Sequence, residues 1–388
     1  MRVRVADLVM NSFFFQSCWI TLRSLCASVL ALTFCFAGTL AAAASDGIYA
    51  AAASTDSQLL FKPPVGYDAG FHTAVALHPS GLAVEVHESE YTSALWYHIG
   101  KQSGMNLVWG DSKQTGVNGY HPAVAITKEG YVIVVHANKN EKSDCNLYYR
   151  VGWIDPYGNQ NQSITWLTDF IFWDAGFNVS FSINDQGVIV GVHEAGGGGD
   201  GLYYRVGHFL NPVGGDFKIQ WDSGPWGIRY DTGVNPGIAI NSRNEVVQVH
   251  QVPGETLLHY RRGIVSGGAI QFGESNRYDN YAQHPAVALL DSGMVLEVHS
   301  LGGLISRTGN LSASNPAEIE WHKPVKINES GHVKYPALAT NGAHAIETHS
   351  DYFKVVYPLY YSVATICDCG IDRLESLGNE SSLLDWQN

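Results

Sequence analysis

The side chains best suited to chemistry in this 388-residue sequence recur at regular intervals. Six histidines each end a short apolar run such as Ala83–His87, and successive histidines are 49 to 57 residues apart. An imidazole can bind a metal, transfer a proton or donate a hydrogen bond near neutral pH. Because a residue present in every repeat usually serves the architecture, we predict a structural role for these repeat histidines: His87, His136, His193, His250, His299 and His349.

Carboxylates, guanidinium groups and aromatic rings recur close to these histidines. Such groups can hold a sugar, because charged side chains bond its hydroxyls and an aromatic ring stacks on its apolar face. The alternative is a buried Arg–Glu pair with aromatic packing between sheets. The candidate ligand-binding residues are Glu85, Trp96, Tyr97, Tyr149, Arg150, Tyr204, Arg205, Arg261, Glu297 and Glu347.

The elements that position these side chains are short strands with period-two hydrophobicity. In the repeat around His193 they are Val179–Ile183, Ile189–His193, Leu202–Gly207 and Ile219–Trp221. A tight turn with a late glycine joins the first two strands. Apart from a short stretch at Asp372–Leu377, no segment shows helical periodicity. Six units of four antiparallel strands predict an all-β, six-bladed β-propeller.

The two ends of the repeat region indicate how the ring closes. The sixth repeat has three strands and ends near Leu359–Val363, while Leu59–Phe61 precedes the first repeat at the spacing of a fourth strand. We therefore predict that the N-terminal strand closes the last blade. The alternative closing strand is Leu383–Trp386 in the C-terminal tail.

A second polar position precedes the first strand of each repeat. In a propeller these residues would surround one mouth of the central channel. Imidazoles and amides there could bind a metal or an anion, or could cap polar backbone groups at a water-filled mouth. We expect no metal, because no carboxylate joins the set at a fixed position. The members of this channel-mouth ring are His72, His121, Asn178, Asn235 and His284, with Tyr335 in the sixth repeat.

An aspartate in the linker between repeats forms a Tyr-Asp-x-Gly pattern. It resembles a calcium loop only loosely, because the dense oxygen spacing of such loops is missing. We predict that these aspartates bond their own backbone as Asx turns. They are Asp68, Asp174, Asp231 and Asp279.

The first 44 residues have the order of a secretory signal peptide. Basic residues precede the apolar run Leu25–Leu40, and Ala41–Ala44 offers a cleavage site. The alternative is an uncleaved anchor, although the run is shorter than the ~20 residues of a spanning helix. We predict a signal peptide at 1–44, a propeller at 45–366 and a tail at 367–388, with secretion and no membrane span after cleavage.

The net charge narrows the range of possible partners, and the cysteine count indicates what must stabilise the fold. The formal net charge is −13, which repels nucleic acid and anionic lipid, so no nucleic-acid partner is expected. Cys145, Cys367 and Cys369 remain after the predicted cleavage. An odd number of cysteines gives no disulfide framework, so the core must stabilise the fold.

The strands Leu202–Gly207 and Ile219–Trp221, together with the glycine-rich turns, resemble the repeats of lectin-type six-bladed propellers, the tectonin-like and fucose-lectin-like group. The resemblance extends over about Leu59 to Ile366. It implies multivalent glycan binding between blades, often through arginine, glutamate and an aromatic side chain. The Val-His strand ending and the Tyr-Asp-x-Gly linker depart from that pattern.

We therefore expect a secreted, non-enzymatic protein that binds a glycan or another extracellular surface ligand without a cofactor. One alternative is a propeller glycoside hydrolase or lyase, which would need two carboxylates at one channel mouth only. The carboxylates noted above recur instead, and hydrolase motifs such as Gly-x-Ser-x-Gly are absent from the sequence. The other alternative is a protein-interaction scaffold.

Overall fold

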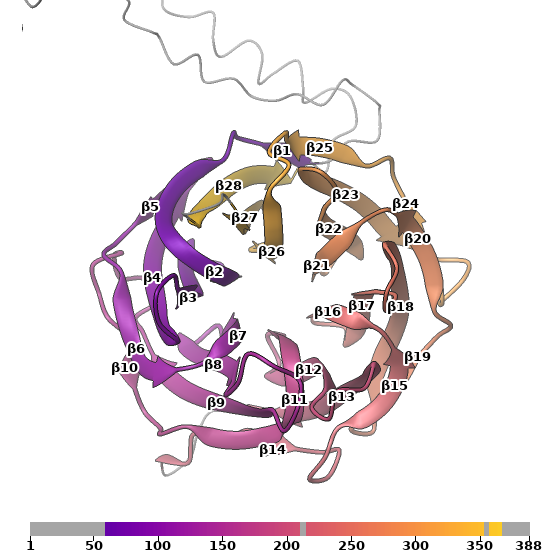
Figure 1. Cartoon of the computed structure of the whole chain (residues 1–388), viewed down its shortest axis with the longest axis horizontal. Coiled ribbons are helices and arrows are strands. Elements are labelled where there is room, and N and C mark those ends of the chain that lie inside the picture. The colour runs from indigo at the N-terminus through magenta and orange to yellow at the C-terminus, as the bar shows by residue number, and fades with distance from the viewer. Residues whose placement is uncertain (1–58, 210–214, 353–356, 367–388) are drawn as a thin grey trace, which may run out of the picture. The chain divides into compact units, whose positions relative to one another are not determined.

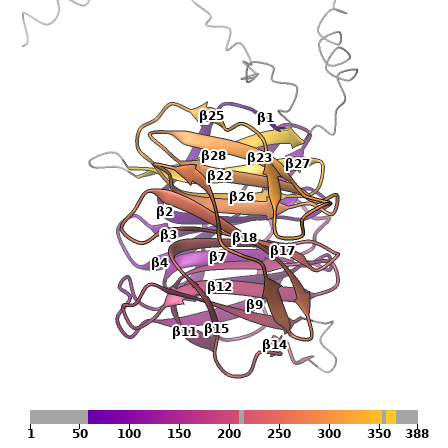
Figure 2. The same ribbon diagram turned by 90° about the vertical axis from the view of Figure 1, so that its right-hand side faces the viewer.

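The computed structural model describes residues 59–209, 215–352 and 357–366, and it confirms the six-bladed β-propeller (Figure 1). Each blade is an antiparallel sheet, and the inner strands run roughly along the channel axis (Figure 2). Among the described residues, no helix is long and apolar enough to cross a membrane.

The strands of each blade follow one another outward from the channel. The innermost strands are β2 (Val65–Leu77), β7 (Tyr120–Ile126), β11 (Ile171–Ile183), β16 (Val234–Ile240), β21 (Gln283–Leu289) and β26 (Val333–Thr340). The second strands carry the repeat histidines and are β3 (Leu82–Ser89), β8 (Tyr131–Ala137), β12 (Val188–Ala195), β17 (Glu245–Gln251), β22 (Met294–Ser300) and β27 (His344–Asp351).

The two outer layers complete the blades. The third strands are β4 (Ala94–Ser103), β9 (Asn146–Trp153), β13 (Gly201–His208), β18 (Leu257–Ser266), β23 (Leu304–Leu311) and β28 (Pro358–Ile366). The fourth strands are β5 (Asn106–Trp109), β10 (Thr165–Trp166), β14 (Gln220–Trp221), β19 (Ala269–Phe272), β24 (Ile319–Trp321) and β1 (Leu59–Phe61). Linker strands also pair with the third strands; they are the first halves of β2 and β11, and β6 (Lys113–Asn118), β15 (Ile228–Thr232), β20 (Asn276–Asn280) and β25 (Val325–Asn328).

The alternating residues of each blade pack against the two neighbouring blades. In the first blade Ala74 and Val84 face the second blade, where they meet Val134. Val75 and Ala83 face the opposite way and join a cluster of the sixth blade. Both faces of the inner strands are therefore buried, which explains why these strands are rich in valine and alanine on both faces.

The N-terminal strand closes the ring, as predicted. Strand β1 pairs antiparallel with β28 of the sixth blade, with Phe61 opposite Ala364. Phe61 is only 2% exposed and packs with Leu296 of the fifth blade. The alternative closing strand at Trp386 and the predicted signal peptide lie outside the described residues.

Each channel-mouth ring residue has the same unusual backbone conformation. All six have a φ between 46° and 53°, in the left-handed region, and each lies at a register shift between the first and second strands. Asparagine and histidine tolerate this region better than most residues, and β-branched residues are strongly disfavoured there. The bulge turns the start of the inner strand toward the channel mouth.

We expect His284→Asn to fold with a free energy of unfolding close to that of the wild type, because Asn178 and Asn235 hold the equivalent position. His284→Val should be less stable than His284→Asn by about 1–2 kcal/mol, since valine has to adopt the left-handed backbone. Urea unfolding of the two variants measures the difference. Equal stabilities would contradict the importance of this conformation.

We expect Phe61→Ala to lower the free energy of unfolding by about 3–5 kcal/mol, because it leaves a cavity where the ring closes. Val65→Ala is the matched control, since Val65 is 50% exposed on the next strand. Urea unfolding of both variants provides the test. Similar small losses for both would mean that β1 contributes little to closure.

Candidate functional site at the channel mouth

The repeat histidines are buried and hydrogen-bonded inside the blades. In four blades Nδ1 faces the side chain two residues earlier, as His299 Nδ1 does at 3.0 Å from Glu297. In the other two blades Nδ1 faces a backbone carbonyl, as His193 does at 2.9 Å from Glu194 O. The linker glycine packs on the ring, since a Cβ on Gly176 would come within 2.2 Å of His193 Nδ1. These contacts favour the structural role, which stays a prediction.

The predicted glutamates take part in these same contacts. Glu85, Glu297 and Glu347 have no exposed surface, and each faces the Nδ1 atom of its own repeat histidine. They lie in three different blades, so the structure does not bring them together.

The predicted arginines and tyrosines lie at the seams between blades. Arg150 donates to the carbonyls of Thr168 and Thr115 at 2.8 Å and stacks on Trp166 at 4.6 Å. Arg205 stacks similarly on Trp221, and Arg261 donates to Asp231 at 2.6 Å.

The tyrosine hydroxyls accept backbone N–H groups of the next blade, as Tyr97 does from Ile164, Tyr149 from Ile219 and Tyr204 from Ile270. Trp96 is half-buried opposite His87. A sugar-binding role for these residues stays a prediction.

The channel-mouth ring brings its six members close together. The ring of His72 lies 3.9 Å from both His121 and Tyr335, and His284 lies 4.3 Å from Tyr335, measured between centroids. Asn178 donates to Asn235 Oδ1 at 2.6 Å. Burial lowers the pKa of each of these three histidines to about 3, so the imidazoles are neutral at pH 7.

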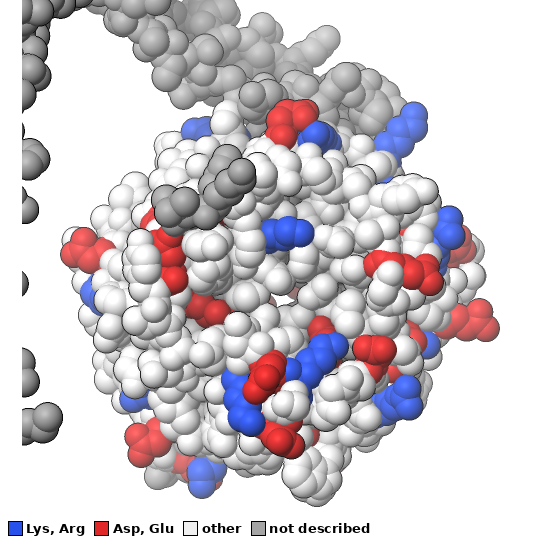
Figure 3. All heavy atoms as spheres, in the orientation of Figure 1, with Lys and Arg blue, Asp and Glu red and all other residues white. Residues whose placement is uncertain are grey.

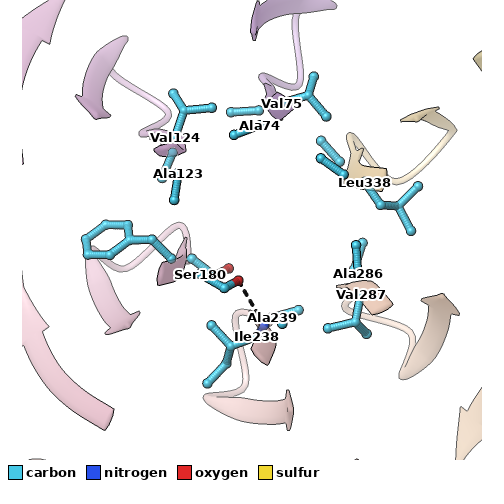
Figure 4. Close-up of a pocket in the computed structure, with 18 of the residues that line it drawn as sticks. Ala74, Val75, Ala123, Val124, Ser180, Ile238, Ala239, Ala286, Val287 and Leu338 are labelled. Carbon is cyan, nitrogen blue, oxygen red and sulfur yellow. Dashed lines mark hydrogen bonds between the residues drawn. The ribbon is translucent and has the colours of Figure 1, made fainter. Parts of the chain in front are cut away.

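Behind this polar mouth the innermost strands form the channel wall, with Val75, Val124 and Val287 among its residues (Figure 4), and the bore has a volume of about 290 Å³. More of the surface that faces the bore is polar than apolar, because the valine side chains pack between blades and the free edges of the innermost strands face the channel. Ser180 and Ser182 also lie there, and they accept hydrogen bonds from Ile238 N at 3.1 Å and Ile240 N at 3.4 Å. Polar groups are therefore present both at the mouth and along the bore.

Two carboxylates missed in the sequence analysis contact the mouth ring. Glu88 lies 2.7 Å from His72 Nδ1 and accepts the backbone N–H of His121. Glu194 accepts both Asn178 Nδ2 and the backbone N–H of Asn235 at 2.8 Å. Both follow a repeat histidine directly, and the other four repeats have Ala137, Gln251, Ser300 and Ser350 in that position.

The two carboxylates have different surroundings. Burial raises the pKa of Glu88 above its usual range, although the nearby His121 and His87 act in the opposite direction. Glu194 is in contact with the ammonium group of Lys142. Burial together with the charges of Glu88 and Glu194 raises the pKa of Tyr335, so both carboxylates act on the same mouth residue.

An aromatic cluster borders the same mouth. Phe71 lies 4.3 Å from Tyr357 and 5.5 Å from Tyr352, whose ring lies 6.0 Å from Tyr335. Aromatic faces of this kind can stack on the apolar face of a sugar. Figure 3 shows one face of the molecule, with a central hollow and a surface formed mostly by uncharged groups.

Comparison with known proteins supports the fold. No family model matches the sequence, and no curated protein matches it. An α-L-arabinanase of Penicillium chrysogenum, solved with arabinobiose, is similar in structure with a TM-score of 0.54 and 11% identity over 80% of this chain and 99% of its own. A GH93 α-L-arabinofuranosidase of Fusarium graminearum gives 0.53 and 11% over 79% and 98%. A sialidase of Trypanosoma rangeli gives 0.51 and 12% over 80% and 56%.

These comparisons correct the functional expectation. The likeness to propeller repeats is confirmed at the level of the fold, but the lectin-type resemblance is not. The similar solved structures named here are glycoside hydrolases and a sialidase, so the prediction of a non-enzymatic lectin was wrong.

Proposed function

We propose that this protein is a glycoside hydrolase that acts on a glycan bound at the channel mouth. The observation that carries the proposal is the pair Glu88 and Glu194, two carboxylates that occur in only two repeats and contact one ring of neutral polar side chains. The similar propellers include enzymes whose structures contain arabinobiose, which supports a sugar substrate. The predicted signal peptide supports action outside the cell.

Glu88 is suited to the role of proton donor. Glycosidic bond cleavage needs an acid that is still protonated near the working pH, and burial raises the pKa of this carboxyl. Glu88 lies 2.7 Å from His72 Nδ1 but is not hydrogen-bonded to it, and His72 borders the channel. Glu88 is therefore the proton donor, and a turn of the His72 ring would let its neutral imidazole pass the proton to the glycosidic oxygen.

Glu194 supplies the second carboxylate that glycoside hydrolysis requires. Lys142 and the two amide donors balance its negative charge and fix its position. A carboxylate near the anomeric carbon stabilises the positive charge that develops there in the transition state. The aromatic cluster of Phe71, Tyr352 and Tyr357 would hold the sugar ring over these groups.

We expect Glu88→Gln and Glu194→Gln each to lower kcat by roughly 10²–10⁴-fold, the usual contribution of a positioned acid or base. KM should change little, because glutamine keeps the size and the hydrogen-bond acceptor of each side chain. The measurement is reducing-sugar release from a panel of arabinans, other polysaccharides and sialosides.

Glu129→Gln is the control for that experiment, because Glu129 lies in the turn after β7, at the other end of the channel strands. Its activity should equal that of the wild type. Activity that survives in both mouth variants, or no activity of the wild type on any substrate of the panel, would contradict the proposed function.

The pH profile provides a separate test of the acid. Because the pKa of Glu88 is raised in the folded protein, its protonated form persists above the usual range of a glutamate. The rate should therefore fall as the pH rises through this raised pKa, and Glu88→Gln should remove that limb from any residual activity. A basic limb that is unchanged in the variant would assign the acid to another group.

A further inference from the structure

The linker aspartates have different partners in different blades. In the fourth blade Asp231 faces His250 Nε2 at 3.8 Å and Arg261 at 2.6 Å. The fifth blade repeats this arrangement with Asp279, His299 and Arg307. There the guanidinium group balances the aspartate and connects the linker strand to the blade.

The first blade has a histidine where the second to fifth blades have arginine. His98 occupies the position of Arg150, Arg205, Arg261 and Arg307 in the third strand. Asp68 Oδ2 consequently faces two imidazoles, with His98 Nε2 at 2.8 Å and His87 Nε2 at 3.6 Å. The three ligand atoms all lie within 4.8 Å of one another.

The outer nitrogens of both imidazoles are already engaged. His98 Nδ1 lies 2.8 Å from the carbonyl oxygen of Gly110, which can only accept, so Nδ1 carries the proton. His87 Nδ1 lies 3.1 Å from the Glu85 carboxylate and donates to it in the same way. Each imidazole therefore directs Nε2 toward Asp68. The 2.8 Å contact of His98 Nε2 with Asp68 Oδ2 is a hydrogen bond in which Nε2 carries a proton, and a metal ion would replace that proton.

Two imidazole nitrogens and a carboxylate oxygen that converge on one point need a positive charge between them, supplied by a proton or by a metal ion. Metal-binding histidines characteristically donate their second N–H to a carboxylate or a backbone carbonyl, which is the arrangement of His87 and His98 here. In the fourth and fifth blades the arginine supplies the positive charge beside the aspartate, and the first blade lacks this arginine.

We propose that Asp68, His87 and His98 form a binding site for a divalent transition-metal ion such as Zn²⁺. Two nitrogen ligands and one carboxylate oxygen suit this class of ion. Bonds of about 2.0–2.1 Å place tetrahedral ligand atoms about 3.4 Å apart. The gap between Asp68 and His87 is close to this spacing, and the gap between Asp68 and His98 needs only about half an ångström more. The sequence led us to interpret Asp68 as an Asx-turn residue and His87 as structural, so no metal was expected at this site.

The metal ion would link the first and sixth blades, where the two ends of the ring meet. Asp68 belongs to the first half of β2, which pairs with β28 of the sixth blade, whereas His87 and His98 belong to β3 and β4 of the first blade. Asp68 has a side chain that is 30% exposed, which leaves room for solvent ligands. The ion would cross-link the seam that arginine cross-links in the fourth and fifth blades.

The test is Zn²⁺ binding to chelator-treated full-length protein, measured by isothermal titration calorimetry and by thermal unfolding with and without Zn²⁺. The wild type should bind one ion per chain and unfold at a higher temperature in its presence. His98→Arg should abolish both effects and still fold, because it introduces the residue of the second to fifth blades. No saturable binding to the wild type would mean that only a proton occupies the site, and would overturn the proposal.

Two further variants make the test specific. Glu85→Gln mimics the fourth blade, where Gln248 accepts from His250, and should weaken Zn²⁺ binding by roughly 10–100-fold. If His98→Arg does not fold, the Zn²⁺ affinity of Glu85→Gln tests the proposal. Glu88→Gln removes a carboxylate from the group formed by His72, Glu88 and His121, and should leave Zn²⁺ affinity unchanged. Loss of binding in Glu88→Gln, or full binding in His98→Arg, would overturn the assignment.

Discussion

The left-handed backbone of the channel-mouth ring is the constraint on which the polar chemistry of this propeller depends. It creates a bulge in the first strand of every blade. One backbone N–H per blade therefore has no hydrogen-bond partner in the neighbouring strand of its own sheet. A buried N–H without a partner costs free energy. Glu88 meets this need for His121, and Glu194 meets it for Asn235. The carboxylates at the mouth are thus held by the same bulge that forms the ring.

In this repeated structure the proposed functional residues lie where one or two repeats differ from the others. The contact common to all six blades fixes a buried side chain on its own strand, as the hydrogen bonds of the repeat-histidine Nδ1 atoms show. Glu88 and Glu194 occur in two repeats only, and they are the carboxylates that we propose for catalysis. His98 in place of arginine occurs in one repeat, and it creates the group of imidazoles around Asp68.

The fold could be predicted from the sequence because its causes are local and repeated six times. The period of the histidines, the four strands and the place of Phe61 depend on hydrophobic alternation and spacing. The mouth ring was also identified, since its members precede the first strand of every repeat. Its left-handed conformation could not be predicted, because valine and alanine around it carry no signal for a bulge.

The candidate site was harder to predict, for a physical reason. The glutamates two residues before the repeat histidines attracted attention because they recur, yet they are buried against those histidines. Sequence does not reveal whether an arginine such as Arg205 faces solvent or the carbonyls of the next blade. The useful signal was the residue after each repeat histidine, which is a glutamate in two repeats and differs in the other four.

The most direct test of the central claim is a crystal structure of the Glu88→Gln variant with a bound oligosaccharide. The account predicts a sugar ring across the channel mouth, stacked on the cluster of Phe71, Tyr352 and Tyr357. Its glycosidic oxygen should lie within hydrogen-bond distance of His72 or residue 88, with Glu194 on the other side of the scissile bond. A sugar bound at the seams around Arg150 and Arg205, with the mouth empty, would contradict it.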